Sequence, residues 1–323
     1  LTLSANNTYS GATNINVGIL SITHNNALGS TAGATIVADG ASLSISNDIT
    51  SPENITISGT GISSNGAIRN TADDNTLTGL ITLAANSEIQ IDSGSSLTLN
   101  PTTGSAITGT YNLTIESVGT SSINDPIATS TGNLIKTGAG TLNLSGTNTY
   151  TGDTTISNGT IKLTGAVNTA TDLIIASGAT LDLQSTQTFA SLDLDGTISN
   201  STGSSALTIT GTSDIGGSIT TSGTQDYEAA ITLTGNTTLV SGDQITFDTT
   251  VNSEGSETNN LTITASEVQF DGIIGGSRTL GVISITGSLD LNQAISNATS
   301  LSVSSTSNLG ANVTTTSTQT YTS

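Results

Sequence analysis

The segment 132–165 constrains the fold of this chain more than any other. Its sequence, GNLIKTGAGTLNLSGTNTYTGDTTISNGTIKLTG, alternates apolar and polar residues in short runs. A period of two is typical of a β-strand that buries one face. The runs are centred on Leu142/Leu144, Thr154/Ile156 and Ile161/Leu163. Glycine-containing breaks between them allow the positive φ angles of sharp turns. Because each strand is too short to form a sheet alone, such units become stable only by stacking on copies of themselves.

A second copy of this unit lies at residues 1–18, where LTLSANNTYSGATNINVG aligns with residues 142–159. The recurring positions include Leu1, Leu3, Tyr9, Gly11, Ile15 and Gly18, which match Leu142, Leu144, Tyr150, Gly152, Ile156 and Gly159. The repeated sequence resembles the autotransporter-associated β-strand repeat of passenger regions in large bacterial surface proteins. The resemblance implies a right-handed parallel β-helix displayed outside the cell, commonly adhesive. It implies no catalytic residues, because the family's motif is structural.

Aliphatic pairs at the same period continue through the rest of the chain, and a second repeat type begins near Ser185. Its marker is Gln-x-aromatic, found at Gln187-Thr188-Phe189, Gln225-Asp226-Tyr227 and Gln319-Thr320-Tyr321. This half resembles repeats of filamentous-haemagglutinin-like exoproteins. The hydrophobic period does not change at the junction. We therefore predict an all-β fold, a right-handed parallel β-helix (β-solenoid) in a single elongated rod. Residues 1–185 hold the autotransporter-type repeats, and residues 186–323 continue the same solenoid with the second type.

The composition supports a narrow repetitive β core and excludes several classes of function. Apolar residues make up 33% of the chain and aromatic residues 2%, and cysteine is absent, so a disulfide framework and a thiolate metal site are excluded. The net charge of −20 comes from 24 acids and four bases. Nucleic acid is excluded as a partner because phosphate binding needs clustered Lys and Arg, and anionic membrane surfaces are disfavoured. No apolar run approaches the roughly 18 residues of a membrane helix.

Two features are expected to interrupt the coils. Proline cannot donate to a β ladder, so Pro52, Pro101 and Pro126 are expected at corners between strands. The segment 62–76, ISSNGAIRNTADDNT, has weak periodicity and holds Arg69, Asp73 and Asp74. We expect it to be a loop pushed out of the solenoid body. Because loops on a rigid scaffold commonly carry binding, this loop and the long faces are the predicted contact surfaces, in place of a deep pocket.

An enzyme is the main alternative, because polysaccharide lyases and hydrolases also use β-helices. Such chemistry needs carboxylates paired with nearby bases in a cleft. The bases are Arg69, Lys136, Lys162 and Arg278, and the one histidine is His24. Both lysines lie in the repeat consensus, where a solvated strand-edge lysine is the ordinary interpretation. His24 reads as an exposed turn residue. We therefore predict no enzymatic activity, no catalytic residue and no cofactor-binding or metal-binding residue.

Other patterned residues are interpreted as structural. Acids alternate with leucine at Leu181-Asp182-Leu183, Leu192-Asp193-Leu194-Asp195 and Leu289-Asp290-Leu291. Stacked in neighbouring coils they would form an oxygen ladder for Ca²⁺, which is the one cofactor hypothesis left open beside solvated strand faces. The pairs Thr208/Thr210, Thr232/Thr234 and Thr262/Thr264 are too irregularly spaced for an ice-binding face. We interpret Asn148 and Asn158 as residues of turns or side-chain ladders. We interpret Tyr9 and Tyr150 as packing residues at a coil corner.

The function predicted from these observations is structural and adhesive. The chain is expected to be a segment of a bacterial cell-surface or secreted β-solenoid protein, outside the cell. The alternatives are a carbohydrate-active β-helix enzyme and a self-assembling extracellular fibre or coat subunit. The expected partners are glycans or proteins of host or neighbouring cells, with self-association end to end or laterally, and neither nucleic acid nor a small-molecule substrate. The sequence begins and stops inside repeats, which predicts either an interior window of a longer polypeptide or coils that stack on neighbouring subunits.

Overall fold

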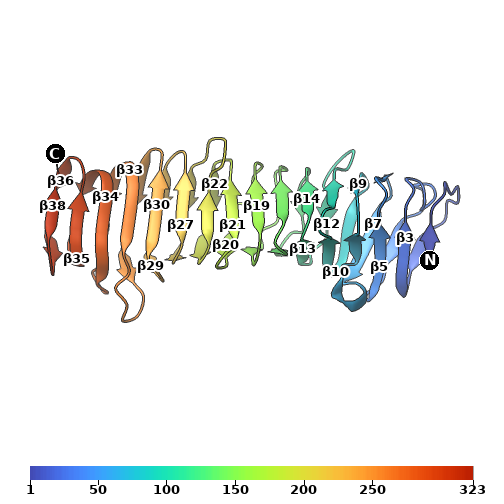
Figure 1. Cartoon of the computed structure of the whole chain (residues 1–323), viewed down its shortest axis with the longest axis horizontal. Coiled ribbons are helices and arrows are strands. Elements are labelled where there is room, and N and C mark those ends of the chain that lie inside the picture. The colour runs from blue at the N-terminus through green and yellow to red at the C-terminus, as the bar shows by residue number, and fades with distance from the viewer. Residues whose placement is uncertain (323) are drawn as a thin grey trace. The chain divides into compact units, whose positions relative to one another are not determined.

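The computed structural model describes residues 1–322. Its regular secondary structure consists almost entirely of parallel β-strands. It contains two compact units, Leu1–Asn168 and Thr169–Ser323. The strands that pair within each unit run parallel, as the side-by-side arrows of Figure 1 show. The one helical segment in the described residues is the 3₁₀ turn η1 (Ile62–Ser64). Both units are β-solenoids, so the predicted fold class is confirmed. The single rod and the change of repeat type at 185/186 stay predictions.

The strands of the first unit stack in three columns, one strand of each column in most coils. The first column contains β1 (Thr2–Leu3), β3 (Gly18–Ile22), β5 (Ala41–Ile45), β8 (Ile68–Asn70), the second half of β10 (Ile81–Ile91), β13 (Leu113–Ser117), β16 (Leu134–Thr137) and β18 (Thr154–Ile156). The second column contains β2 (Thr13–Ile15), β4 (Thr35–Val37), β7 (Ile55–Gly59), the first half of β10, β12 (Ile107–Thr108) and β15 (Ile127–Ala128). The third column contains β6 (Thr50–Ser51), β9 (Asp74–Leu77), β11 (Ser96–Leu99), β14 (Thr120–Ile123), β17 (Thr141–Leu144) and β19 (Thr160–Leu163).

The second unit has the same three-column plan. One column contains β20 (Asp172–Ile175), β23 (Ser191–Leu194), β26 (Ser213–Ile215), β29 (Ile231–Leu233) and β32 (Val251–Ser253). Another contains β21 (Thr180–Leu183), β24 (Thr197–Ser199), β27 (Ser218–Thr221), β30 (Thr237–Ser241), β33 (Leu261–Phe270), β34 (Leu280–Leu291), β35 (Ile295–Val303) and β38 (Gln319–Tyr321). The third contains β22 (Gln187–Phe189), β25 (Leu207–Ile209), β28 (Gln225–Tyr227), β31 (Gln244–Phe247), the second halves of β33 and β34, and β36 (Ser307–Leu309). The strand β37 (Val313–Thr315) pairs with β35.

The core of each unit is built from inward side chains stacked in register between coils. Leu142 pairs with Ile161 and Leu144 with Leu163, and all four side chains are buried. The inward position predicted for Leu142 and Leu144 is therefore confirmed. Full burial of one such aliphatic side chain contributes about 1.5–3 kcal/mol, and the contribution repeats in every coil. The in-register parallel pairing of neighbouring coils keeps like residues on top of one another, although the coil length varies.

The Gln-x-aromatic marker has a clear physical basis in the second unit. Residues two apart on a strand face the same side, so the glutamine and the aromatic ring both point inward. The Tyr227 hydroxyl donates to Gln225 Oε1 over 3.0 Å, which satisfies a polar atom inside the core. The ring of Tyr227 stacks on Phe247 with centroids 5.3 Å apart, and Phe247 lies 5.1 Å from Phe270. In the two tyrosine copies the marker supplies its own hydrogen-bond partner, and Tyr227 joins a stack whose other rings come from the following coils.

The loop expected at 62–76 is correct for residues 62–66, which lie outside the strands, and wrong where the segment forms strands. Residues 68–70 form β8, which pairs with β5 and β10, and residues 74–77 form β9 in the third column. Ile68 is fully buried. The weak periodicity arose because inward positions of these strands are held by Asn70 and Asn75, whose side-chain amides hydrogen-bond to each other over 2.7 Å. The predicted corners are confirmed, since Pro52, Pro101 and Pro126 all lie between strands.

Candidate functional site

The outer face of the first unit is interrupted by a short segment that folds back over the neighbouring coil. Residues 60–66, here called the strap, connect β7 to β8 and contain η1. Ser63 and Ser64 both have positive φ angles, 55° and 56°, in a region that costs energy for residues with a Cβ atom. The repeat alone does not require such a segment. Strained backbone held in place by its surroundings is often found at functional sites.

Two hydrogen bonds to a single serine fasten the strap to β5. Ser42 Oγ donates to the Gly66 carbonyl over 2.8 Å and accepts from the Ile62 backbone N–H over 3.0 Å. The strap also closes on itself, because the Gly66 N–H donates to the Thr60 carbonyl over 2.8 Å. Ser42 is buried beneath it. The strap is therefore a fixed part of the outer face and encloses the space beside it.

That space is a groove of about 130 Å³ on the outer face of β3, β5 and β8. Its lining combines four hydroxyls, one amide, one guanidinium and two aliphatic side chains. The lining residues are Ile19, Ser21, Ser42, Ser44, Ile62, Asn65, Arg69 and Thr71. Ser21, Ser44 and Arg69 stand side by side in this row, because β3 pairs with β5 and β5 with β8 in register. The groove is consequently rich in hydrogen-bonding groups with little charge.

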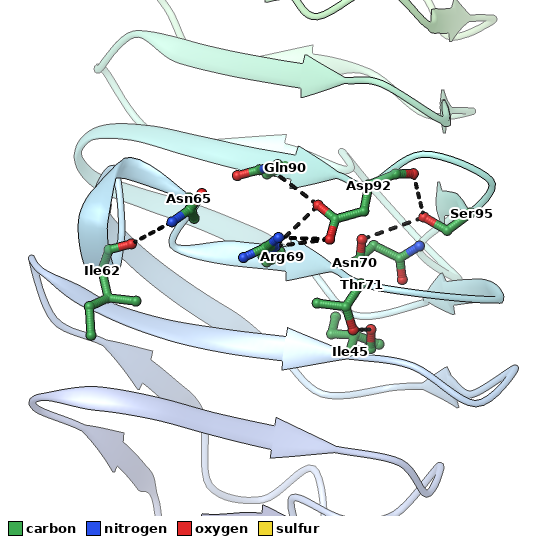
Figure 2. Close-up of polar contacts among 9 residues, drawn as sticks. All are labelled: Ile45, Ile62, Asn65, Arg69, Asn70, Thr71, Gln90, Asp92 and Ser95. Atoms are coloured by element: carbon green, nitrogen blue, oxygen red, sulfur yellow. Dashed lines mark hydrogen bonds and ion pairs between the residues drawn. The ribbon is translucent and has the colours of Figure 1, made fainter.

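Arg69 is held in the groove wall by the carboxylate of Asp92, just beyond β10. Its Nε lies 3.1 Å from both carboxylate oxygens, and Nη2 lies 2.8 Å from Oδ2. Gln90 donates from Nε2 to Asp92 Oδ1 over 3.2 Å, so one carboxylate binds two side chains. Figure 2 shows these three residues meeting beside the strap residues Ile62 and Asn65. The two-point geometry of this ion pair fixes the guanidinium plane.

Two further carboxyls lie close to this row but outside the groove. Glu116 on β13 is the register partner of Gln90, and Glu88 lies two residues earlier on β10. Burial, followed by the neighbouring Glu116, raises the pKa of Glu88 to about 7. Glu88 is 8% exposed, and its Oε1 is buried without a hydrogen-bond partner among the described residues. Because Glu88 does not line the groove, its carboxyl cannot reach a ligand bound there.

Lys136 corrects the interpretation of the repeat lysines. A solvated strand edge was expected, but its side chain is 0% exposed and points inward between Ile115 and Ile156. Nζ donates to backbone carbonyls of Thr137 over 2.5 Å, Gly138 over 2.6 Å and Asn158 over 3.3 Å. Burial lowers the pKa of Lys136 to about 8, against the opposing effect of Glu116. The ammonium joins carbonyls of successive coils and is structural.

The other bases lie apart from this groove on their own elements. Lys162 points outward on β19 beside Asn143 and is half-buried, in line with the solvated interpretation. Arg278 is exposed in the turn between β33 and β34. His24 is a half-buried turn residue, whose Nδ1 accepts from the Asn26 N–H over 3.1 Å. Among these candidate bases, Arg69 alone lines the groove.

The leucine-flanked acids do not form one continuous ladder, although Asp193 does stack on the acid Asp214 of the next coil. Asp182 pairs with Ser199, Asp193 with Asp214, and Asp290 with Gln269 and Asn308. Asp182 instead accepts hydrogen bonds from the Ser201 backbone and hydroxyl. In the described part of the chain no group of three or more His, Cys, Asp or Glu residues is placed to hold a metal ion. Calcium binding stays a prediction without an assigned site.

The remaining patterned residues behave as packing and turn residues. The three threonine pairs lie at β25, β29 and β33, which do not pair with one another. Asn148 forms the expected ladder, since Oδ1 accepts from Ile127 N–H and Nδ2 donates to the Ala166 carbonyl. Asn158 is an exposed turn residue. Tyr9 and Tyr150 make the same contact in both copies, their hydroxyls lying 2.6 and 2.7 Å from Thr13 and Thr154.

The loop expected at 62–76 includes strap residues 62–66, but sequence reasoning missed the path of the strap and the groove-lining serines. The signal that was present is the glycine pair Gly61 and Gly66, both at positive φ and separated by four residues. A Cβ at Gly61 would overlap the Gly66 carbonyl and the Ser42 hydroxyl, so glycine is required where the strap closes. Two such glycines around a polar stretch indicate a compact excursion of the backbone, even though they do not show which surface it covers.

A short parallel-stranded coil with an outward polar face and inward aliphatic rows defines the class as a β-solenoid repeat protein. The family model described as passenger-associated-transport-repeat matches residues 1–22 and 134–163. These are the two segments that form the internal repeat, so the resemblance is confirmed: the chain carries the repeats of autotransporter passengers. No curated protein and no solved structure matches the chain. Among the described residues, no helix is long and apolar enough to cross a bilayer.

Proposed function

We propose that this chain is a structural and adhesive segment of a bacterial cell-surface or secreted protein. The observation that carries the proposal is the combination of passenger repeats with stacked, in-register coils. The passenger repeat family implies a secreted or surface-exposed protein. A stack of coils whose inward side chains fill a narrow core provides long, hydroxyl-rich outer faces and has no need of a ligand to fold. Such a scaffold suits display and attachment at an exposed surface.

The geometry of the candidate bases supports a non-enzymatic role. Proton transfer to a bound glycan requires an acid or base within hydrogen-bond reach of the ligand. Arg69 is neutralised by Asp92, Lys136 is buried among carbonyls, and Glu88 is covered. We expect no turnover when the protein is incubated with pectin, alginate or neutral polysaccharides and reducing ends are measured. Cleavage that disappears in Arg69→Ala would support the enzyme alternative.

Attachment is tested directly with beads that carry the 323-residue chain. We expect the beads to bind bacterial or epithelial cells above the level of beads coated with an unrelated acidic protein of similar net charge. A net charge of −20 alone alters contact with cell surfaces. The control of similar charge therefore separates specific attachment from this effect of charge. Binding no greater than that control on every cell type would contradict the adhesive role. Self-association of the chain stays a prediction.

A further inference from the structure

The groove beside the strap offers unused hydrogen-bonding groups in a fixed arrangement. A guanidinium has five N–H donors, and the hydrogen bonds of Arg69 to Asp92 involve only Nε and Nη2. Its Nη1 makes no hydrogen bond within residues 1–322. Ser21 and Ser44 stand beside Arg69 in the same row. Their hydroxyls likewise make no hydrogen bond to the described part of the chain. These groups remain free to bind a ligand with several hydroxyls.

The groove also has an apolar side that a purely polar ligand would not use. Ile19 is 45% exposed on β3, and Ile62 of the strap is half-buried on the other side. A sugar ring is amphipathic, because hydroxyls project from its edge while its C–H groups form apolar faces. Aliphatic walls beside a row of donors and acceptors therefore match one ring. The strap is already fastened through Ser42, so little ordering is needed when a ligand binds.

Charge and size restrict the class of ligand further. Arg69 is balanced by Asp92, and the chain carries a net charge of −20, which repels an anionic ligand. A neutral ligand is favoured over a uronate, a sialate or a phosphate. The volume of about 130 Å³ is well below the roughly 300–1,000 Å³ of sites that enclose a drug-sized ligand. The groove accommodates a single ring of a longer chain.

We propose that the groove formed by Ser21, Ser44, Arg69 and the strap binds one neutral sugar ring of a cell-surface glycan. Arg69 Nη1 and the two serine hydroxyls hydrogen-bond neighbouring hydroxyls of the ring, and Ile19 and Ile62 contact its C–H face. This assignment rests on the proposed adhesive function and names the ligand class for it. A single ring with few contacts binds weakly, with a Kd on the order of 1 mM, so attachment depends on many copies acting together.

The test is binding of the 323-residue chain to immobilised oligosaccharides. The neutral arm contains glucan, mannan, galactan and N-acetylglucosamine oligomers, and the acidic arm contains alginate and pectate oligomers. We expect binding to at least one neutral series, unchanged between about 0.05 and 0.5 M NaCl because no charge pairs with the ligand. Binding restricted to the acidic arm, with a loss of affinity in salt, would overturn the inference, as would no binding to either arm.

Two variants locate the binding in the groove. Ser44→Phe places a ring over Ser21 and Arg69 without touching the core, and we expect at least about a tenfold loss of affinity. Ser284→Phe is the matched control, since Ser284 is an outward, half-buried serine at the centre of a row in the second unit. Arg69→Lys keeps a charge for Asp92 but removes the Nη1 donors, and we expect weaker binding than in Arg278→Lys.

The outcomes separate this inference from the proposed function. If beads carrying Ser44→Phe lose neutral-sugar binding and cell attachment together, both proposals are supported. If the wild-type chain attaches to cells but Ser44→Phe and Arg69→Lys bind sugars like their controls, the groove is excluded and the adhesive function stands. Equal unfolding midpoints for Ser44→Phe and Ser284→Phe establish that a loss of binding reflects the groove and not the fold.

Discussion

At the scale of single residues, the two repeat lysines show that a shift of one residue in the strand pattern moves a side chain from the outer face into the core. Ile135-Lys136-Thr137 and Ile161-Lys162-Leu163 look alike in the sequence, yet Lys136 faces inward and Lys162 outward. In β16 the inward positions are Leu134 and Lys136, so Ile135 points outward. A period-two pattern cannot decide between these phases when two aliphatic residues are adjacent. The register with neighbouring coils decides it.

Replacing Lys136 tests its buried state through the dependence of stability on pH. Its pKa is about 8 in the folded chain and near 10.4 when unfolded, so the unfolded chain binds more protons between these values. The free energy of unfolding should therefore rise by about 1–2 kcal/mol between pH 7.5 and 9.5 in the wild type. Lys136→Met should abolish that rise, as measured by urea unfolding. Lys162→Met is the control and should retain it; a rise that survives in Lys136→Met would contradict the assignment.

Two buried carboxyls predict the opposite pH dependence in the acidic range. Burial raises the pKa of Glu53 and of Glu88 to about 7. Glu53 is 2% exposed, and its carboxyl oxygens lie near the buried Thr35 hydroxyl without hydrogen-bond partners. The folded chain holds these protons more tightly than the unfolded chain. Stability is therefore full below about pH 4.5 and is lost as the pH rises through 7, by about 1–3 kcal/mol for each carboxyl.

The measurement is the urea midpoint at pH 5 and pH 8. The wild type should be more stable at pH 5 than at pH 8, and Glu53→Gln and Glu88→Gln should each reduce the difference. Glu254→Gln, which removes an exposed carboxylate from the second unit, should leave the difference unchanged. Equal midpoints at both pH values in the wild type would show that these carboxyls are hydrated in the folded chain.

At the scale of elements, the sequence predicts the strands of a coil well but does not predict the path of the strap. The strand centred on Leu142 and Leu144 follows from the period-two pattern and its glycine breaks. The course of residues 60–66 depends on Ser42, which is distant in sequence and contacts the strap only after the coils have stacked. The surroundings of the acids depend on the register in the same way, since Asp182 lies opposite Ser199 whereas Asp193 lies opposite Asp214.

The central coil can be tested by placing a charge in its core. Leu144 is buried between Ile123 and Leu163, so Leu144→Asp leaves an unpaired carboxylate in an apolar row. We expect a loss of about 3–5 kcal/mol and faster amide exchange in β14, β17 and β19. Asn143→Asp, one residue earlier on the outward face, is the control and should cost less than about 0.5 kcal/mol. Similar losses for both variants would contradict the assigned faces.

Removal of residues 64–73, which lie in the segment expected to be a loop, should disrupt the fold. The structure places β8 within that range, and β8 lies between β5 and β10 in the first column. Its loss would leave Leu43 and Ile89 without Ile68, the buried neighbour that they share. Changes at Ser44 and Arg69 are therefore the appropriate tests of the outer face.

At the scale of the whole molecule, one physical rule accounts for both units. Inward residues at every second position stack in parallel on their counterparts about one coil, near 20 residues, away. This rule, together with the repeated segments, made the all-β solenoid class and the passenger repeat predictable from the sequence. It left the groove unpredicted, because the groove arises where three coils and the strap meet and none of its residues forms a motif. The proposed adhesive role consequently rests on a surface that only the stacked coils create.

The parallel register of neighbouring coils is the central claim, and contacts between methyl groups measure it most directly. In a sample with labelled Ile, Leu and Val methyl groups, nuclear Overhauser contacts should join Leu142 with Ile161 and Leu144 with Leu163. A further contact should join Leu144 with Ile123 in the preceding coil. The crossed pattern, Leu142 with Leu163 and Leu144 with Ile161, would indicate antiparallel strands and contradict the account.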